Sequence, residues 1–282
     1  MAQIIDGKGL AAKICAEVAE EAAKLPKRPC LATVLVGDDP ASQVYVRNKE
    51  KDCAKCGIES RRCDLPASAT QEEVLKLIDE LNNDTAVDGI LIQMPLPAQI
   101  DEGAVIEAIR ADKDVDAVNP SNVGKMITGE PALWSCTPAG VMEIFSEYNI
   151  SLDGKICVMV GRSNIVGKPM SQLMLRENGT VICCHSRTPN LAEMTRQADI
   201  LVVAVGRPGL ITADMVKEGA VVIDVAVNRD KETGKLLGDV CFDEVKEKAS
   251  FVTPVPGGVG PMTRAMLMKN ILTASKAAHG ML

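Results

Sequence analysis

The chain has 282 residues, of which 46% are hydrophobic and 24% are charged, so we expect one large or two ordinary globular domains rather than a disordered chain or a coiled coil. A formal net charge of −7 argues against a protein that wraps nucleic acid, and aromatic residues at 2% provide little for stacking on bases. A site for a small molecule fits this composition better.

The N-terminal residues, MAQIIDGKGL, lack the basic and apolar regions of a signal peptide, and no apolar run approaches the roughly 18 residues of a membrane span. The ten cysteines include one cluster with ligand-like spacing, at Cys53, Cys56 and Cys63. No second pair follows at zinc-site spacing, and the two histidines are distant in sequence. We therefore expect a cytoplasmic protein with reduced cysteines, and no metal, no membrane partner and no nucleic-acid partner.

Apolar runs bounded by turn residues alternate with helical patterns along the whole chain, which is typical of an α/β fold with mostly parallel sheets. The strands are expected at residues 30–36, 59–63, 89–93, 156–160, 180–184, 200–205, 220–225 and near 251. The helices are expected at residues 9–23, 41–56, 71–81, 101–109, 138–147 and 262–278. The Asn-, Pro- and Gly-rich residues 119–131 are interpreted as a connection between two α/β series.

The expected helix at residues 41–56 carries a candidate reactive group. At 3.6 residues per turn, an arc of about 100° holds Tyr45, Val46, Lys49, Cys53 and Cys56. Lys49 is thus on the apolar face, where loss of hydration lowers a lysine's pKa and allows proton exchange near neutral pH. An ordinary exposed lysine is the alternative.

Two further candidates follow in the first half. Gln93 ends an apolar run at the strand edge where α/β proteins bind ligands, so its amide needs a partner there: Lys49 or a substrate. A glutamine that caps a loop carbonyl is an equal alternative. Among three nearby acids, Asp112 and Asp114 are interpreted as solvated, and Asp116 as a carboxylate that accepts two hydrogen bonds from a planar amino-heterocycle.

A glycine-containing turn follows the expected strand at 156–160. Strand, glycine turn and helix form a phosphate-binding geometry, because backbone N–H groups and the helix N-terminus face the ligand. The match to the dinucleotide fingerprint is imperfect, since Ser163 replaces its second glycine and Gly167 comes one residue late. A structural turn is therefore the alternative, while a P-loop is excluded because proline stands where a magnesium-binding Ser or Thr is needed. The turn contains Gly161, Arg162, Ser163, Ile165 and Gly167.

The end of the next expected strand bears on the choice of cofactor. An Asp or Glu usually binds the ribose 2′-hydroxyl of NAD there, but this chain has Ser186 and Arg187. A hydroxyl and a guanidinium suit a 2′-phosphate, and Arg162 supplies a possible second positive charge. The sequence therefore favours NADP over NAD, with a solvated surface Arg187 as the alternative.

The segment at residues 254–261 combines three glycines with three prolines before the last helix, whose partner could be either half. Glycines such as Gly257 and Gly258 permit close backbone approach to a ligand, and prolines such as Pro261 stiffen the loop. A structural turn is again the alternative.

Together these segments resemble the bifunctional methylenetetrahydrofolate dehydrogenase/cyclohydrolase family. The resemblance covers nearly the whole chain through motifs in the right order, at residues 42–49, 88–97, 113–116, 136–138, 161–167 and 254–263. It implies two α/β domains with a cleft between them: a catalytic folate-binding domain of residues 1–118, on which helix 262–282 packs, and a Rossmann-type parallel-sheet NADP-binding domain of residues 119–261. It also implies a homodimer.

The resemblance further implies roles for individual residues. Tyr45 and Lys49 would shape the reaction centre, Gln93 would tune the lysine, and Asp116 would hold the pterin. The dinucleotide would be bound by Gly161, Arg162, Ser163, Ile165, Gly167, Ser186 and Arg187, and the folate and nicotinamide would be bordered by Gly257, Gly258 and Pro261. Departures from the family's common residues occur at Ala117, Val118, Ser135 and Ala226, and none removes a proposed reacting group.

The activity implied by the resemblance is NADP-dependent oxidation of 5,10-methylenetetrahydrofolate, followed by hydrolysis to 10-formyltetrahydrofolate, in one-carbon metabolism and purine biosynthesis. An NADP-dependent dehydrogenase of another small metabolite, such as a shikimate-type hydroxy acid, would leave Gln93 and the apolar-face lysine unexplained. A non-catalytic NADP sensor is the other alternative, and the presence of Lys49, Gln93 and Asp116 weighs against it.

Overall fold

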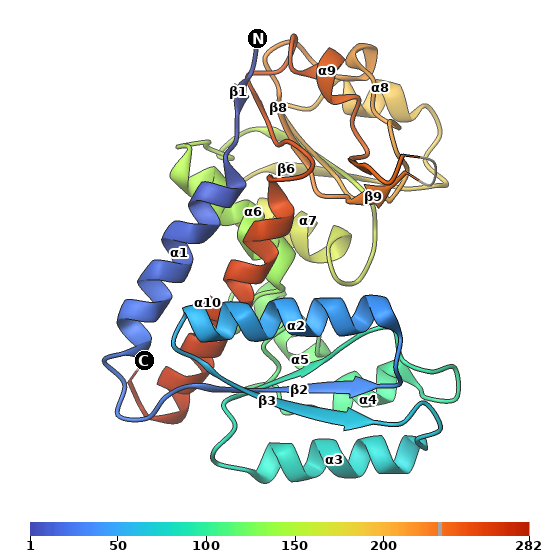
Figure 1. Cartoon of the computed structure of the whole chain (residues 1–282). Helices are drawn as coiled ribbons and strands as arrows, with labels where there is room; N and C mark the ends of the chain where they lie inside the picture. Colours follow the sequence, from blue (N-terminus) through green and yellow to red (C-terminus); the bar gives the residue numbers. More distant parts are fainter. Residues whose placement is uncertain (231–232, 282) are drawn as a thin grey trace. The chain divides into compact units, whose positions relative to one another are not determined.

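A computed structural model describes residues 1–230 and 233–281 of the chain, so Leu282 of the expected segment 262–282 lies outside the described residues. The residue contacts divide the chain into two units (Figure 1). Unit 1 contains Met1–Ala11 and Thr137–Thr263, and unit 2 contains Ala12–Cys136 and Arg264–Leu282. The divisions fall within three helices, namely α1 (Gly7–Ala22), α6 (Cys136–Glu147) and α10 (Val259–Ala278).

Unit 2 is built on a three-stranded parallel sheet in the order β3-β2-β4, with β2 at Cys30–Val36, β3 at Glu59–Leu65 and β4 at Gly89–Ile92. Its central strand β2 is buried over its whole length, as expected for a parallel strand covered on both faces. The covering helices include α2 (Pro40–Lys55) and α3 (Gln71–Asn83), which lie on opposite faces of the sheet (Figure 1). A shorter helix, α4, spans Glu102–Ala108.

The core of unit 2 follows from two periodicities. Alternate residues of β2 point to one face of the sheet, and residues of α3 spaced by three or four positions meet them there. A capping box of Thr70 and Glu73 fixes the start of α3. The buried cluster includes Cys30, Ala32, Val34 and Val36 of β2, Val74, Ile78 and Leu81 of α3, Ile90 and Ile92 of β4, and Val105 of α4.

The interpretation of residues 119–131 as a connection is wrong, because helix α5 occupies Pro120–Thr128. Its start is marked by the Asn119 side chain, which accepts a hydrogen bond of 2.8 Å from the Ser121 N–H, and by Pro120 in the first turn. Its end is marked by Gly129 in a left-handed conformation, with φ of 82°. The same Asn, Pro and Gly that indicated a loop are the start and stop signals of a short helix.

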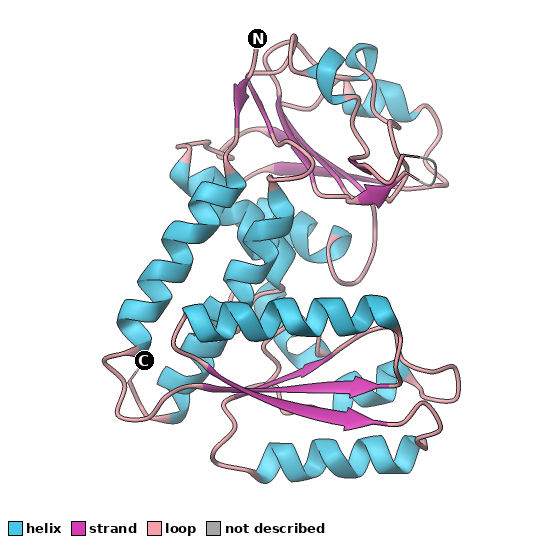
Figure 2. Ribbon diagram, in the orientation of Figure 1, coloured by secondary structure: helices cyan, strands magenta, loops and turns pink. Residues whose placement is uncertain are grey.

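Unit 1 contains a six-stranded parallel sheet in the order β1-β11-β8-β7-β5-β6 (Figure 2). The strands are β1 (Gln3–Ile4), β5 (Ile156–Val160), β6 (Thr180–Cys184), β7 (Ile200–Val203), β8 (Val221–Asp224) and β11 (Phe251–Val252). The connections contain α7 (Gly167–Arg176), α8 (Leu191–Thr195), the 3-10 turn Ala213–Met215, the antiparallel pair β9 (Asn228–Arg229) and β10 (Leu236–Leu237), and α9 (Phe242–Val245). The sequence predicted five of the six parallel strands and missed β1.

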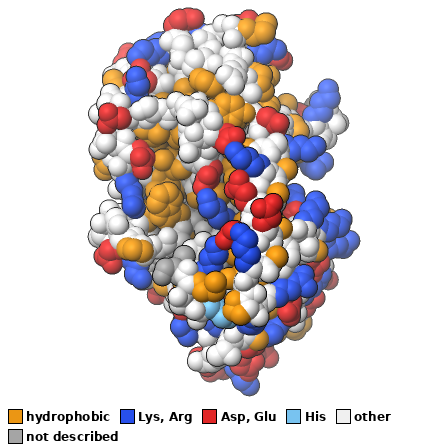
Figure 3. Space-filling model, turned by 90° about the vertical axis from the view of Figure 1, so that its left-hand side faces the viewer, with side chains coloured by type: hydrophobic (Ala, Val, Ile, Leu, Met, Phe, Trp, Pro, Cys, Tyr) orange, Lys and Arg blue, Asp and Glu red, His pale blue; other side chains and the backbone are white. Residues whose placement is uncertain are grey.

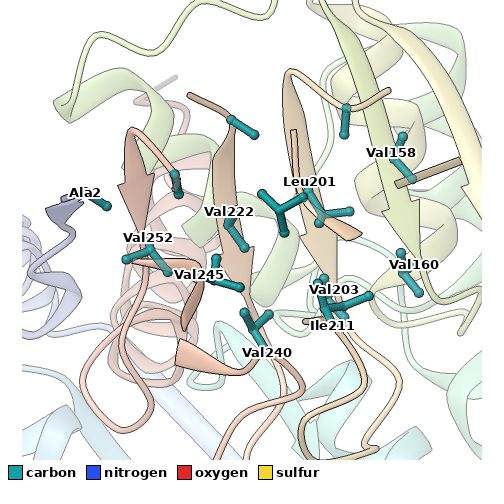
Figure 4. Packing of buried hydrophobic residues seen from close by; sticks show 14 of the residues in the cluster. Ala2, Val158, Val160, Leu201, Val203, Ile211, Val222, Val240, Val245 and Val252 are labelled. Carbon is teal, nitrogen blue, oxygen red and sulfur yellow. The ribbon is translucent and has the colours of Figure 1, made fainter. Parts of the chain in front are cut away.

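Alternate valines and leucines of these strands form the core of unit 1 (Figure 4). Each fully buried side chain of this size contributes roughly 1.5–3 kcal/mol to folding. The labelled residues include Val158, Val160, Leu201, Val203, Val222 and Val252 from the strands and Val245 from α9.

The last helix begins at Val259, three residues earlier than expected, so Pro261 lies in its first turn rather than in the preceding loop. Proline is well suited to that turn, because its fixed φ matches the helix and its missing N–H would have had no partner within the helix. Residues 262–278 of the expected helix are all helical.

A buried carboxylate, Asp224 at the end of β8, joins several segments of unit 1. It accepts hydrogen bonds from the backbone N–H groups of Val240 at 2.9 Å, Asp239 at 3.1 Å and Ala226 at 3.3 Å. A Cβ atom on Gly238 would lie only 1.8 Å from an Asp224 oxygen, so this close approach requires glycine. Burial raises the pKa of Asp224 to about 6, against the lowering effect of the N–H donors.

This shift makes the stability of unit 1 depend on pH. The folded carboxyl binds a proton below about pH 6, whereas an unfolded one binds it only below its ordinary pKa of 3.8. The favourable contribution of Asp224 is therefore greatest at low pH and is lost as the pH rises from about 4 to about 6.

We expect the free energy of unfolding of wild type, relative to that of Asp224→Asn, to fall by on the order of 2 kcal/mol over this window. Urea unfolding followed by circular dichroism from pH 4 to 7 measures it. Asp243→Asn is the control, since that side chain is 88% exposed. A wild-type-to-variant difference that stays constant with pH would contradict the shift.

Candidate active site

The topology of unit 2 places its candidate residues at one edge of the sheet. Because β3 and β4 lie on opposite sides of β2, the chain reverses its strand order there, and such a switch point at the carboxyl ends of strands is the usual ligand site of an open α/β sheet. Lys49 lies on α2, the helix that follows β2, and Gln93 directly follows β4. Both residues therefore come from segments that leave this edge.

The side chains of Lys49 and Gln93 form a hydrogen bond in which Nζ donates to Oε1 at 3.1 Å. The Gln93 Nε2 group donates to the carbonyl oxygen of Met94 at 2.7 Å. Both partners that the sequence left open for Gln93, the lysine and a loop carbonyl, are thus present together. The second bond fixes the orientation of the amide, so its oxygen must face the lysine.

Lys49 is half-buried, and burial lowers the pKa of its ammonium group. The negative charge of Asp116 opposes this effect without overcoming it, so the pKa stays below that of an ordinary lysine. The expectation of a partly dehydrated lysine on the apolar face of the helix is confirmed.

Tyr45 differs from its expected surroundings. Three other members of the arc, Val46, Cys53 and Cys56, are fully buried, but Tyr45 is 62% exposed. Tyr45 lies on α2 one turn before Lys49, at the edge of the buried face rather than within it.

Asp116 reaches the same edge through strand-like pairing beside β4. Asp114 forms a parallel bridge with Ile90, so Asp116, two residues further along, lies toward the carboxyl end where Gln93 follows β4. The Asp116 carboxylate is half-buried and is a hydrogen-bonding neighbour of the buried Cys136 thiol. Burial, followed by the charge of Asp116, raises the pKa of Cys136, which therefore stays a neutral thiol.

Asn270 of α10 supports this group, and sequence reasoning did not identify it. Its Nδ2 group donates to the carbonyl oxygens of Val115 at 2.8 Å and Trp134 at 2.9 Å, and to the Cys136 sulfur at 3.5 Å. One buried amide thus holds the residue before Asp116 and the segment before α6. Only the unusual presence of an asparagine on an otherwise apolar helix face signals this role.

The interpretation of Asp114 as solvated is wrong, since the residue is 1% exposed. It accepts hydrogen bonds from the Asn119 N–H at 2.7 Å and the Asn122 amide at 3.2 Å, and so ties the start of α5 to the sheet. Burial raises the pKa of Asp114. Asp112 is exposed, as expected, and pairs with Arg110.

Ala117, one of the departures from the family pattern, has a φ of 55°. This left-handed conformation favours glycine, because the Cβ of other residues clashes with the backbone there at a cost of roughly 1–2 kcal/mol. The strained residue directly follows Asp116.

The glycine turn of unit 1 joins β5 to α7 as predicted. A Cβ atom on Gly161 would lie 2.4 Å from the Ala204 carbonyl oxygen, and one on Gly167 would lie 2.4 Å from the Gly161 oxygen. Both glycines are therefore required by close packing of the chain on itself. Ser163 binds the start of α7: its hydroxyl oxygen accepts hydrogen bonds from the N–H groups of Val166 at 3.2 Å and Gly167 at 3.3 Å.

The register of β5 and β6 places the predicted cofactor residues at one edge of the sheet. Val160 pairs with Cys184, so the turn from Gly161 and the turn at residues 185–188 leave side by side. The Gly161 N–H donates to the Cys184 carbonyl at 2.9 Å. The exposed side chains at this edge include those of Arg162, Ser163, Ile165, Ser186 and Arg187.

The segment at residues 254–261 packs closely against the start of α1 within unit 1. The Lys8 N–H donates to the Gly257 carbonyl at 3.0 Å, and a Cβ atom on Gly7 would lie 1.9 Å from the Gly258 oxygen. Gly257 has a φ of 109°, which favours glycine. Close packing of the chain within unit 1 therefore accounts for these glycines.

Among the described residues, no group of three His, Cys, Asp or Glu side chains is arranged to hold a metal ion, and no helix is long and apolar enough to cross a membrane. All ten cysteines are free thiols. On the face drawn in Figure 3, acidic and basic side chains are interspersed.

Comparisons with known proteins match both halves of the chain to one family. Residues 5–116 match the catalytic domain of tetrahydrofolate dehydrogenase/cyclohydrolase, and residues 135–279 match the NAD(P)-binding domain. The bifunctional protein FolD of Agathobacter rectalis is 55% identical over 98% of this chain and 100% of its own length.

Solved structures agree with this match. The bifunctional enzyme FolD of Campylobacter jejuni has a TM-score of 0.97 at 48% identity, covering 98% of this chain and 99% of its own. The FolD of Trypanosoma brucei, solved in complex with NADP and an inhibitor, has a TM-score of 0.93 at 39% identity, covering 99% and 98%. The chain therefore belongs to the tetrahydrofolate dehydrogenase/cyclohydrolase family, the family of the bifunctional FolD proteins.

Proposed function

We propose that this chain oxidises 5,10-methylenetetrahydrofolate with NADP and hydrolyses the resulting 5,10-methenyltetrahydrofolate to 10-formyltetrahydrofolate. The single observation that carries the proposal is the half-buried Lys49, bonded to an oriented Gln93 amide, with Asp116 as its neighbouring charge. Both halves of the chain match one folate family, which argues against a shikimate-type dehydrogenase.

In the hydrolytic step, water adds to the methenyl carbon and loses one proton, which leaves a hydroxyl group on that carbon. When the bond from the carbon to N5 breaks, N5 gains a proton, and the hydroxyl releases its remaining proton to solvent as it becomes the formyl carbonyl. A neutral Lys49 amine can take the first proton and return it to N5, which requires the lowered pKa that burial produces. Gln93 holds the amine by accepting one of its N–H groups. We assign Tyr45 to the rim of the same centre and Asp116 to the two N–H donors of the pterin.

The edge of β5 and β6 fits NADP. The Ser163 oxygen accepts two N–H groups, so its own O–H stays available to a pyrophosphate at the start of α7. Ser186, Arg187 and Arg162 supply a hydroxyl and two guanidinium groups for the 2′-phosphate. When bound, NADP accepts the hydride of the folate one-carbon bridge, and the protein contributes mainly by positioning.

Several assignments rest on the resemblance to the family. Residues 1–118 with helix 262–282 would bind folate, residues 119–261 would bind NADP, and Ile165, Gly167, Gly257, Gly258 and Pro261 would border the ligands. We also propose a homodimer that works in the cytoplasm. The free thiols support the reducing compartment.

Lys49→Met removes the proposed proton shuttle at nearly constant side-chain length. We expect the hydrolysis of methenyltetrahydrofolate to slow by roughly 10²–10⁴-fold while NADP still binds. The rate is measured from the decrease in the absorbance of methenyltetrahydrofolate. Lys51→Met is the matched control, because Lys51 is exposed on the same helix. Hydrolysis at the wild-type rate in the Lys49 variant would remove the lysine from the mechanism, and would favour a different shuttle or a non-catalytic sensor.

Gln93→Glu replaces the amide oxygen that faces Lys49 with a carboxylate. A neighbouring negative charge favours the ammonium form, so the pKa of Lys49 should rise and the pH profile of hydrolysis should move to higher pH by on the order of one unit. The pH dependence of kcat for methenyltetrahydrofolate measures this. An unmoved profile would mean that this hydrogen bond does not act on the reacting amine.

Arg187→Ala tests the choice of cofactor. Loss of one charge-assisted bond to the 2′-phosphate should raise KM for NADP on the order of tenfold and leave KM for NAD nearly unchanged. Dehydrogenase assays with each cofactor give the ratio, with the exposed Arg196→Ala as control. An equal rise in KM for NADP and NAD would show that Arg187 does not bind the 2′-phosphate.

A further inference from the structure

The loop after β7 covers a second buried carboxylate in unit 1, that of Asp239, which is 0% exposed. One of its oxygens accepts from the N–H groups of Val205 at 2.7 Å and Gly206 at 2.9 Å. The other accepts from the Arg207 N–H at 2.6 Å and the Asn228 amide at 3.0 Å. Four neutral donors thus surround one carboxylate.

Three consecutive backbone N–H groups that converge on one anion form a nest, the arrangement with which loops commonly bind phosphate. The turn needs one residue in the left-handed conformation, and Gly206 supplies it with a φ of 72°. Gly206 and Arg207 are exposed, so this loop has the form of an anion-binding loop whose N–H groups point inward to a side chain of the same protein.

The position of this loop connects it with the dinucleotide edge. β6 and β7 lie on opposite sides of β5, so the switch point of this sheet lies at the carboxyl ends of β5 and β7. The Ala204 N–H donates to the Val160 carbonyl at 2.8 Å. The Ala204 carbonyl oxygen lies so close to Gly161 that a Cβ atom there would be 2.4 Å from it. Residues 204–207 therefore border the glycine turn directly.

Asp239 is itself held in place from two sides. Asp224 at the end of β8 accepts the Asp239 N–H at 3.1 Å and the Val240 N–H at 2.9 Å. The Asp239 carbonyl accepts the Ile211 N–H at 3.0 Å. The backbone around Asp239 is thus fixed by hydrogen bonds to β8 and to Ile211, while the loop that its carboxylate binds is exposed at Gly206 and Arg207.

We propose that Asp239 acts as a resident anion that fills the nest of residues 205–207, and so is a positioning residue for the dinucleotide. It fixes the loop beside the glycine turn, and it denies the loop's N–H groups to the phosphates of the cofactor. The pyrophosphate is thereby left to the turn at residues 161–167 alone. This inference rests on the proposed use of NADP.

The test is NADP binding, measured by calorimetry without folate, in Asp239→Asn and Asp239→Gly. We expect at least tenfold weaker binding in both variants, because the loop loses its anchor. In Asp239→Gly, added formate should refill the nest and restore most of the affinity, whereas sodium chloride at equal ionic strength should not. In wild type, formate and sodium chloride should weaken NADP binding to the same extent, because both salts only screen the charges on the cofactor. Asp243→Asn, at an exposed acid on α9, is the matched control.

Two readouts separate positioning from general damage. Hydrolysis of methenyltetrahydrofolate, which we assign to Lys49 and Gln93 in unit 2, should keep its wild-type rate in both Asp239 variants. Hydrogen exchange of the 205–207 amides should accelerate in Asp239→Asn while the β5 amides stay protected. If Asp239→Gly does not fold, the Asn variant and its exchange pattern decide the matter.

Unchanged NADP affinity in a folded Asp239→Asn would overturn the inference, and so would a folded Asp239→Gly that formate does not rescue. A wild-type protein that binds no NADP would instead refute the proposed function. In that case the effect of formate on the exchange of amides 205–207 in Asp239→Gly still tests whether the nest takes an anion.

Discussion

The chemistry assigned to this protein depends on an amine that has lost part of its water but retains one acceptor. An exposed Lys49 would stay protonated and could not take a proton, while a lysine with a carboxylate in direct contact would be held in its charged form. An amide oxygen gives the amine a partner without adding a negative charge, and Asp116 acts on it without a direct hydrogen bond. The loop carbonyl of Met94, by fixing the amide, therefore matters as much as the amide itself.

Both units place their candidate residues by the same rule of parallel sheets. In unit 2, β2 lies between β3 and β4, and in unit 1, β5 lies between β6 and β7. In each sheet two connections therefore leave in opposite directions, and a site opens at the carboxyl ends of the strands. Lys49 and Gln93 use this edge in unit 2, and the turns after β5, β6 and β7 use it in unit 1. Short polar segments after buried strands thus carry the function, while the strands supply rigidity.

The sequence predicted those parts of the structure that local pattern and topology determine. Buried strands such as β5 are unbroken apolar runs in the sequence, and the Lys49–Gln93 contact follows from helix phase and strand order. Helix α5 was missed because Asn119 and Gly129 mark both loops and helix ends. Asp114 and Asp239 were not recognised as buried, since a carboxylate looks solvated in sequence unless its N–H donors, which come from distant segments, are known.

The Asn270 amide donates a hydrogen bond to the carbonyl of Trp134, which is the only tryptophan of the chain. All tryptophan fluorescence of the protein therefore comes from this one residue. Its indole emission originates within unit 2, two residues from the thiol that neighbours Asp116. Intrinsic tryptophan fluorescence is therefore a built-in label for unit 2, and melting of unit 1 alone would not be detected by this signal.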